Sequence, residues 1–401
     1  MAPDERVSRV LRRLVLPVYL PIVAGTFGLA LLVPVLPLYL TEVGLSLRMT
    51  SVVLSGVGIG ATIGGLPAGA LIARFGERRV MFAAIAAVAI TSAVLGLTEA
   101  SIALVAMRLG TGAANIALRL SRQTYITRRV ARTVRGRAMS TIGGSFRMSL
   151  FVGPLLGGVL ADTLGFEATF AIAGAVTALG MIPPLLQPAA ERDDVLDAED
   201  GSPVDPIGLF ESIRVHRRVL ALVAFVPMLT MAVREGRYVV VPLIGDDLGL
   251  SPTAVGALVT VGTAADLVLF PVAGYVLDRF GRLAAMVPSF GLIAIGLVVL
   301  GFADTTGAAV VAGAIMGIGN GLSSGSLLTL GSDLAPADAP GPFLAAIAVI
   351  QDVGKIIGPL LVGFVGSAAS LGTASLVLAG LMVFVIAWLV LVVGETSPRH
   401  A

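Results

Sequence analysis

Four short motifs occur twice in this chain, and each second copy follows its first by the same 205 residues. A constant offset means that the order and spacing of the segments between the motifs are repeated too. The chain is therefore predicted to consist of two parallel halves of similar structure. The paired motifs are Val35-Leu36-Pro37-Leu38 with Val240-Val241-Pro242-Leu243, Gly44-Leu45-Ser46 with Gly249-Leu250-Ser251, Arg74-Phe75-Gly76 with Arg279-Phe280-Gly281, and Gly153-Pro154-Leu155-Leu156 with Gly358-Pro359-Leu360-Leu361.

The composition places these halves in a membrane. Hydrophobic residues make up 56% of the chain and charged residues 13%, whereas soluble domains have about 25% charged residues. A bilayer offers no water to satisfy backbone groups, so membrane-spanning segments must be helices or a closed barrel. The long apolar runs lack the alternation of a barrel strand, which favours helices. The 49 glycines suit close helix packing in lipid.

We expect an all-α polytopic membrane protein with twelve transmembrane helices in two pseudo-symmetric six-helix bundles. The hydrophobic segments predict an N-terminal bundle over residues 1–187, a charged cytoplasmic linker over 188–218 and a C-terminal bundle over 219–401. Arginine clusters fall in the loops that are inside if both termini are cytoplasmic, while the outer loops carry Arg48 as their sole base. This asymmetry predicts a multi-pass protein of the cell inner membrane with both termini in the cytoplasm. The excess of basic over acidic residues is then explained by the orientation of the chain in the membrane, and we expect no nucleic-acid partner.

The loop after the second span resembles the motif G-x-x-x-D-R-x-G-R-[KR] of the major facilitator superfamily, and the loop after the eighth span carries a second copy. The resemblance covers essentially the whole chain and implies that these loops gate the inner face. In the first copy, Ala73 stands in place of the usual Asp and Glu77 in place of a base. The matching residues are Gly69, Arg74, Gly76 and Arg78 in the first copy, and Gly274, Asp278, Arg279, Gly281 and Arg282 in the second.

Two further motifs resemble those of proton-coupled exporters in that family, especially drug:proton antiporters. The segment from Arg108 to Ala114 is similar to R-x-x-Q-G-x-G-A-A, with Thr111 in place of Gln. The segment from Ser149 to Gly158 is similar to G-x-x-x-G-P-x-x-G-G. The resemblance implies that Arg108 influences proton movement. We expect Gly153 and Gly157, with Pro154 bending the helix, to form a smooth strip that slides against a helix of the second half.

The charges inside the spans are the candidates for transport chemistry, because a charge at the bilayer centre costs about 2.5–3.5 kcal/mol on insertion scales. The repeat offset makes Arg147 and Asp352 equivalent positions, and Lys355 follows Asp352 by one helical turn. These three could form a buried network, either as a structural clamp or as a substrate or proton site. Lys355 is the single lysine of the chain.

Asp266 lies midway along the eighth span and is the preferred proton carrier, with Arg108 and Asp352 as further coupling residues. The alternative is an Asp hydrogen-bonded to a neighbouring helix. Arg234 and Arg237 share a face of the seventh span and could meet an anionic substrate, or Glu235 could neutralise one of them. Asn115 shares a face of the fourth helix with Arg108 and completes the cavity set together with Arg147 and Lys355.

The sequence thus predicts a proton-coupled secondary transporter, an exporter of small amphipathic compounds that works by alternating access. A carrier of organic anions, as symporter or exchanger, is the alternative, and a non-transporting membrane receptor stays open. We expect a monomer in the lipid bilayer whose partners are a small-molecule substrate and protons, with no cofactor and no metal. The stretch Gly321-Leu322-Ser323-Ser324-Gly325 matches the hydrolase motif G-x-S-x-G, but we interpret it as small-residue packing within an apolar helix and expect no catalytic residues and no enzyme.

Overall fold

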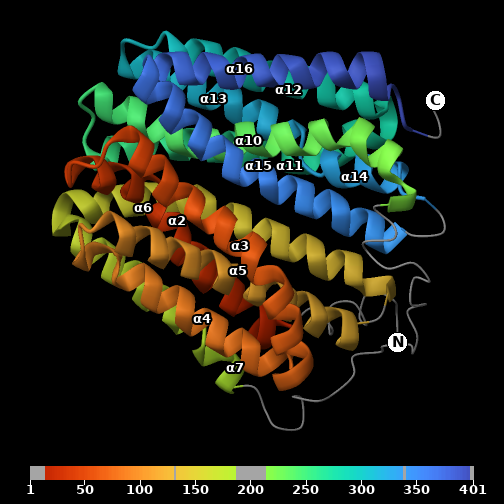
Figure 1. Cartoon of the computed structure of the whole chain (residues 1–401), viewed down its shortest axis with the longest axis horizontal. Helices are drawn as coiled ribbons and strands as arrows, with labels where there is room; N and C mark the ends of the chain where they lie inside the picture. The colour runs from red at the N-terminus through yellow and green to blue at the C-terminus, as the bar shows by residue number, and fades with distance from the viewer. Residues whose placement is uncertain (1–13, 131, 187–213, 337–339, 398–401) are drawn as a thin grey trace. The chain divides into compact units, whose positions relative to one another are not determined.

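The computed structural model describes residues 14–130, 132–186, 214–336 and 340–397, and these residues form helices joined by short turns (Figure 1). The predicted linker is therefore largely outside the described residues. Contacts divide the chain into two units, one of residues 1–36 and 59–202 and the other of 37–58 and 203–401.

The helices of the first repeat are η1 (Val15–Tyr19), α2 (Leu20–Glu42), α3 (Leu47–Phe75), α4 (Glu77–Ala93), η2 (Leu95–Leu97), α5 (Ser101–Arg129), α6 (Arg132–Leu179) and α7 (Ile182–Leu186). Those of the second repeat are α10 (Arg217–Asp247), α11 (Pro252–Phe280), α12 (Arg282–Gly301), α13 (Thr306–Leu322), α14 (Ser326–Asp333), α15 (Pro340–Ala368), α16 (Leu371–Trp388) and η3 (Leu389–Val393).

Eleven helical segments within the described residues are long and apolar enough to cross a membrane. One of them, Thr141–Leu179, has 39 residues, or about 58 Å at 1.5 Å per residue. This is about twice the 30 Å of a bilayer core. Gly165 interrupts it with φ 85° and ψ 167°, values that bend the chain. The segment therefore makes two spans, and the prediction of twelve is confirmed.

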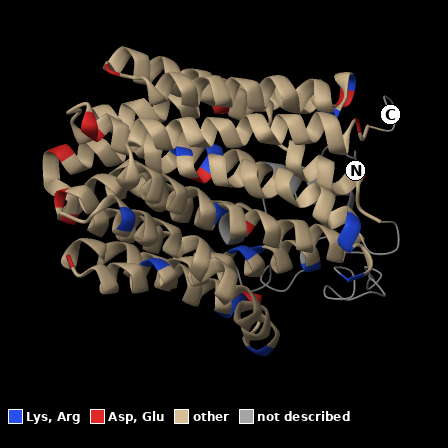
Figure 2. Ribbon diagram, turned by 45° about the horizontal axis from the view of Figure 1, so that its top comes forward, with Lys and Arg blue, Asp and Glu red and all other residues tan. Residues whose placement is uncertain are grey.

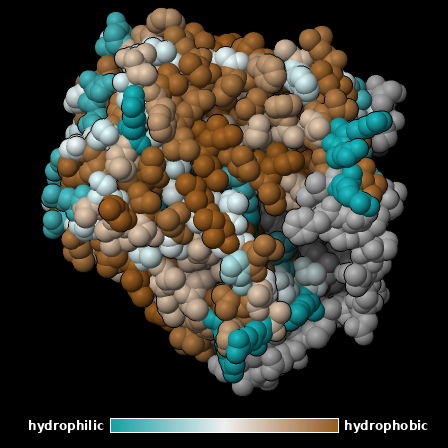
Figure 3. Space-filling view, in the orientation of Figure 1, coloured by the Kyte–Doolittle hydropathy of each residue, from teal (hydrophilic) through white to brown (hydrophobic). Residues whose placement is uncertain are grey.

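The space-filling view in Figure 3 shows hydrophobic atoms over much of the visible face. Large apolar side chains are strongly exposed along many helices, which is expected where lipid is the solvent. Examples are Ile63, Leu66, Ile102 and Leu391.

The repeated Gly-Leu-Ser motif makes a turn followed by a helix cap in each half. Gly44 and Gly249 have φ of 77° and 71°, in the left-handed region that favours glycine. Two residues later in each copy, the hydroxyls of Ser46 and Ser251 accept hydrogen bonds from the backbone N–H groups three positions further on, both at 3.4 Å. The sequence repeat is thus a repeat of local geometry.

The second unit includes the end of the first span and the start of the second, residues 37–58. Thr41 Oγ1 donates to Asp246 Oδ2 at 2.9 Å, and these two residues are equivalent positions 205 apart. Arg48 Nε donates to Ser367 Oγ at 2.8 Å. Residues 37–58 are therefore tied by side-chain hydrogen bonds to α10 and to the end of α15.

Candidate functional site

Charged residues are sparse along the helices, and Figure 2 shows most of the ribbon free of them. Six charged side chains of the second unit lie within α10, α11 and α15 rather than at their ends. They are Arg234, Glu235 and Arg237 on α10, Asp266 on α11, and Asp352 and Lys355 on α15. The candidate site is built from these six residues and the neutral side chains that contact them.

Asp352 and Lys355 form the predicted ion pair, with 2.8 Å between Lys355 Nζ and Asp352 Oδ1. The Asp352 side chain is 12% exposed and that of Lys355 32%. Glu235, on the neighbouring helix, interacts electrostatically with Lys355 most strongly and also with Asp352. The clusters predicted separately on α10 and α15 are therefore one cluster.

Close packing of α10 against α15 brings these charges together. A Cβ on Gly358 would overlap the carbonyl oxygen of Ala232, and a Cβ on Gly354 would overlap that of Met228. Both glycines belong to the second copy of the Gly-Pro motif. Their missing side chains let the two backbones approach within range of the charged groups.

The tenth span is broken beside the site. α13 ends at Leu322 and α14 begins at Ser326, with Gly325 left-handed at φ 79°. The interpretation of Gly321–Gly325 as part of a continuous apolar helix was therefore wrong, because the positive φ of Gly325 interrupts the helix. Arg234 Nη2 donates to Ser323 Oγ at 2.8 Å, so a charged group of α10 contacts the break.

Asp266 is 6% exposed and accepts a hydrogen bond from Asn320 Nδ2 at 2.8 Å on Oδ2. Asn320 lies in the last turn of α13, directly before the break. A Cβ on Gly321 would come within 2.8 Å of the Asp266 carbonyl oxygen, so glycine permits this close approach of α13 to α11. This hydrogen bond is the one expected in the alternative interpretation, an Asp bonded to a neighbouring helix. A proton carrier can make the same hydrogen bond, so that role of Asp266 stays a prediction.

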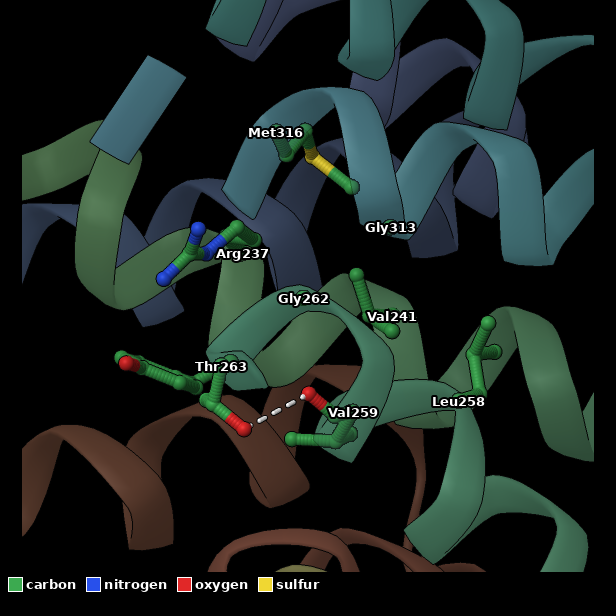
Figure 4. Close-up of a pocket in the computed structure, with 9 residues that line it drawn as sticks. Arg237, Val241, Leu258, Val259, Gly262, Thr263, Gly313 and Met316 are labelled. Carbon is green, nitrogen blue, oxygen red and sulfur yellow. Dashed lines mark hydrogen bonds between the residues drawn. The ribbon is translucent and has the colours of Figure 1, made fainter. Parts of the chain in front are cut away.

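Arg237 lines a pocket enclosed by α10, α11 and α13 (Figure 4). Its volume is about 20 Å³, which is room for about one water molecule. The guanidinium lies at one end of the pocket and apolar side chains at the other. The lining residues are Arg237, Tyr238, Val241, Leu258, Val259, Gly262, Thr263, Gly313 and Met316.

The predicted residues of the first half lie on α5 and α6 of the other unit. Arg108 and Asn115 are half-buried on α5. Thr111, which replaces the Gln of the motif, donates to Thr91 Oγ1 of α4 at 2.9 Å. Arg147 lies on α6 in the first unit, while its equivalent Asp352 lies in the second, so a common network of Arg147 with Asp352 and Lys355 stays a prediction.

The glycine strip of the fifth span packs within its own unit. A Cβ on Gly153 would come within 2.5 Å of Ala30 Cβ, and one on Gly157 would overlap the carbonyl oxygen of Leu31, both on α2. The expected sliding contact with a helix of the second half is wrong, because α2 already occupies this face. Pro154 lies between the two glycines inside α6.

The loops that carry the two copies of the G-x-x-x-D-R-x-G-R motif contain the same ion pair with the charges exchanged. In the first, Glu77 pairs with Arg128 at 3.1 Å; in the second, Arg282 pairs with Asp333 at 2.7 Å. Both pairs join residues 51 apart, at equivalent positions of the repeat. The acid at 77, a departure from the family motif, is therefore matched by a base at 128.

The other motif residues surround these pairs. Gly76 and Gly281 have φ of 81° and 92° and lie directly before the first residues of α4 and α12. Arg74, Arg78 and Arg279 stack over aromatic rings, at 5.2 Å, 5.9 Å and 5.9–6.0 Å from the ring centroids. Asp278 is 80% exposed and 3.9 Å from Arg282, so Asp333 is the main partner of that arginine. Gly69 and Gly274 face open space, since a Cβ added at either would meet no atom within 4 Å.

Glu395, after the last span, caps the start of α12. Its carboxylate accepts hydrogen bonds at 2.9 Å from the backbone N–H groups of Arg282 and Leu283. Burial by itself raises the pKa of the Glu395 carboxyl, but backbone N–H groups of Arg282, Leu283, Ser397 and Thr396 outweigh it, and the net pKa lies below its ordinary value. An ionised carboxylate also suits a helix N-terminus.

We expect Glu395→Ala to lower the free energy of unfolding at neutral pH by about 0.5–2 kcal/mol, as for loss of other N-terminal caps. Because the folded-state pKa is lowered, this stabilisation is present above the unfolded pKa and is lost as pH falls through the folded pKa. Thermal unfolding in detergent across this pH range measures the difference from wild type. A difference that stays constant into acid would contradict the charged cap.

Breaking the Asp352–Lys355 pair is expected to destabilise the second unit. Asp352→Asn removes the carboxylate 2.8 Å from the ammonium and leaves the cluster with one excess positive charge, at a cost between the roughly 1 kcal/mol of exposed pairs and the 3–5 kcal/mol of buried ones. Adding Lys355→Met should recover part of the loss, because the cluster then again has equal numbers of cations and anions. Unfolding midpoints of the single and double variants test this, and a double variant no better than Asp352→Asn would disprove the pairing.

Asn320 and Asp333 were missed by the sequence reasoning, although the repeat could have found both. Asn320 is the position equivalent to Asn115, and Asp333 is equivalent to Arg128. Ser323 and Glu395 had no comparable signal, because their partners lie on other helices far along the chain.

A polytopic helical protein with two repeated halves and charges held at membrane depth belongs to the class of membrane transporters. The model of the Major Facilitator Superfamily matches residues 20–234 and 223–401, and the chain belongs to this family. It is a transporter and not an enzyme.

Relatives and solved structures agree with this assignment. The multidrug resistance protein MdtG of Yersinia enterocolitica is 24% identical over 350 residues, covering 83% of this chain and 81% of MdtG. The nucleoside transporter NupG superposes with a TM-score of 0.74 at 16% identity, covering 94% of this chain and 98% of NupG. The human organic anion transporter MFSD10 (TETRAN) gives 0.64 at 16% identity, covering 97% of this chain and 100% of MFSD10.

Proposed function

We propose that this transporter is a proton-coupled exporter of small amphipathic compounds that works by alternating access. The observation that carries the proposal is Asp266, an acid buried midway along α11 and hydrogen-bonded to Asn320. An intramembrane acid is a candidate proton site, because its protonation responds to burial and to neighbouring charges. The name of MdtG, a multidrug resistance protein, favours export.

The broken tenth span supplies a physical route for coupling. Asn320 holds Asp266 on one side of the break, and Asp333, at the far end of α14, pairs with Arg282 of the gating loop. α14 has eight residues, or about 12 Å. In this proposal, gain or loss of a proton at Asp266 shifts α14, and this movement lengthens or shortens the contact between Arg282 and Asp333.

Flux into proteoliposomes tests the function. A lipophilic cationic dye and an organic anion are each supplied with and without an imposed pH gradient. Proton-coupled export predicts accumulation of a substrate against its gradient only when the pH gradient is present. Equal flux with and without the gradient would refute proton coupling, and absence of counterflow for any compound would favour a receptor.

A carrier of organic anions is the second candidate, favoured by the charges of the first unit. Arg108 and Arg147 lie within its helices, whereas the acids of its described part are at helix ends or beside the bend at Gly165. These acids are Glu77, Glu99, Asp162 and Glu167. The solved structure of MFSD10 is titled as an organic anion transporter. Acceleration of the anion flux and not of the dye flux would select this function.

We further propose an inner-membrane monomer with both termini in the cytoplasm, as the arginine distribution predicts. The chain has no cysteine, so single cysteines at positions such as 48 and 279 can be labelled from either side of the membrane without background. Labelling of both from the same side would refute the orientation.

A further inference from the structure

Arginine side chains cluster on the surface where α10 begins. Arg214, Arg217 and Arg218 are all exposed and line one hollow of the surface. Within the part of the chain that the structure describes, Arg217 and Arg218 make no ion pair or hydrogen bond with an acid. Neighbouring like charges repel each other, so an anion that contacts both guanidinium groups would stabilise them.

The length of α10 places these arginines at the level of the lipid headgroups. The helix has 31 residues, or about 46 Å at 1.5 Å per residue. The hydrocarbon core of a bilayer is about 30 Å thick, and the bilayer with its headgroups about 40–45 Å. A helix of this length reaches the headgroups on both sides of the membrane. Arg217 and Arg218 are its first two residues.

An apolar stripe continues from Arg218 towards the membrane core. Leu222 and Phe225 follow Arg218 by four and seven residues and therefore lie on the same face of α10. Leu222 is 49% exposed and Phe225 40% exposed. Seven residues of helix correspond to about 10 Å. One phospholipid molecule could therefore contact Arg218 with its phosphate and Phe225 with an acyl chain.

Aromatic rings of α16 form a wall beside this stripe. The ring centroids of Phe384 and Trp388 are 6.4 Å and 5.2 Å from that of Phe225. Trp388 Nε1 donates to the carbonyl oxygen of Leu222 at 2.7 Å, and this bond fixes the indole against α10. Since a protein carbonyl already satisfies its N–H group, the indole offers an apolar surface to a neighbouring molecule.

We propose that α10 and α16 form a binding site for an anionic phospholipid. Arg217 and Arg218 hold the phosphate, and an acyl chain lies along Leu222, Phe225 and Trp388. A zwitterionic lipid has the same chains but carries a compensating ammonium group, so it binds more weakly. This site goes beyond the proposed transport function and does not depend on it. In the proposed orientation, the site faces the cytoplasmic leaflet, where anionic lipids make the surface potential negative.

Trp388 is the single tryptophan of the chain, so tryptophan fluorescence reports on this site alone. The full chain is reconstituted into mixed bilayers of phosphatidylglycerol and phosphatidylcholine, in which one of the two lipids carries brominated acyl chains. Bromine quenches a tryptophan that it contacts. We expect brominated phosphatidylglycerol to quench Trp388 more strongly than brominated phosphatidylcholine at equal mole fraction. The relative affinity should be about 5- to 25-fold, since one surface arginine contributes about fivefold.

Arg218→Gln should lower this preference about fivefold, and Arg217→Gln added to it should remove the preference. Arg79→Gln is the matched control, because Arg79 is an exposed arginine near the start of α4 and its substitution removes the same charge from a different helix. The preference of Arg79→Gln should equal that of wild type. Equal quenching of wild type by the two brominated lipids would overturn the proposal without any variant, and so would an unchanged preference in Arg218→Gln.

Glycerol phosphate distinguishes a lipid from a soluble anion. An excess of it in the buffer should leave the preference for phosphatidylglycerol in place, because the acyl contacts are available to the lipid only. Loss of the preference would assign the arginines to a soluble phosphate and overturn the lipid site. Quenching requires no transport, so loss of proton-driven flux with an intact lipid preference would refute the proposed function and leave this site standing.

Discussion

Replacing Asp266 with Asn is expected to abolish pH-driven accumulation of substrate, down to the level of protein-free vesicles. An amide cannot take up or release a proton in the working pH range, so the gradient no longer has a group through which to act. The amide still fits the buried site and can still accept a hydrogen bond from Asn320, as Asp266 Oδ2 does at 2.8 Å. Substrate binding and downhill counterflow should therefore persist.

The matched control is Asp304→Asn, the same substitution at an exposed residue between α12 and α13. It should accumulate substrate like wild type. Uphill transport by Asp266→Asn at the wild-type rate would remove this carboxyl from the mechanism. Loss of binding together with accumulation would assign Asp266 to the substrate site.

Gly157→Ala is expected to give the second large effect, a loss of about 1–3 kcal/mol of stability from overpacking. The added Cβ would overlap the Leu31 carbonyl oxygen. A backbone atom cannot move aside as the end of a flexible side chain can, so α2 and α6 must separate. We expect a lower unfolding temperature and a lower yield of folded protein.

Gly144→Ala on the same helix is the control, because nothing lies within 4 Å of a Cβ added there. Alanine favours a helix over glycine by up to about 1 kcal/mol, so this variant should be neutral or more stable. Equal unfolding temperatures for the two variants would show that the contact between α2 and α6 is loose.

The repeat correctly predicts which positions of the two halves are equivalent, and equivalent positions have equivalent contacts in the structure. Ser149 and Gly354 are equivalent positions, and they contact Thr26 and Met231, which are also equivalent. Ser149, which departs from the motif's first glycine, forms a hydrogen bond of 2.9 Å with Thr26 Oγ1. The helices in contact, α2 with α6 and α10 with α15, are equivalent in the two halves, while the chemistry of the contact differs.

Other features could not be predicted, because they depend on contacts between helices distant in sequence. Asn320 is 54 residues from Asp266, and no helical spacing rule relates them. The break at Ser323–Gly325 lies in a run of small residues that a continuous helix also tolerates, and it is the φ of Gly325 that distinguishes the two. The helix that packs against Gly153 and Gly157 was predicted wrongly, because a helix face of small residues does not show which helix will contact it.

The exchanged charges of the two motif loops, after the second and the eighth span, limit how the halves can be recombined. Grafting the second loop onto the first half would place an arginine at position 77 opposite Arg128, and the reverse graft would place a glutamate opposite Asp333. Each chimera would oppose like charges where the parent has an ion pair. An exchange that carries both members of a pair, the loop together with the end of the helix 51 residues later, keeps the attraction. In exchanges between the two halves, each motif loop must therefore be moved together with the helix end that carries its ion-pair partner.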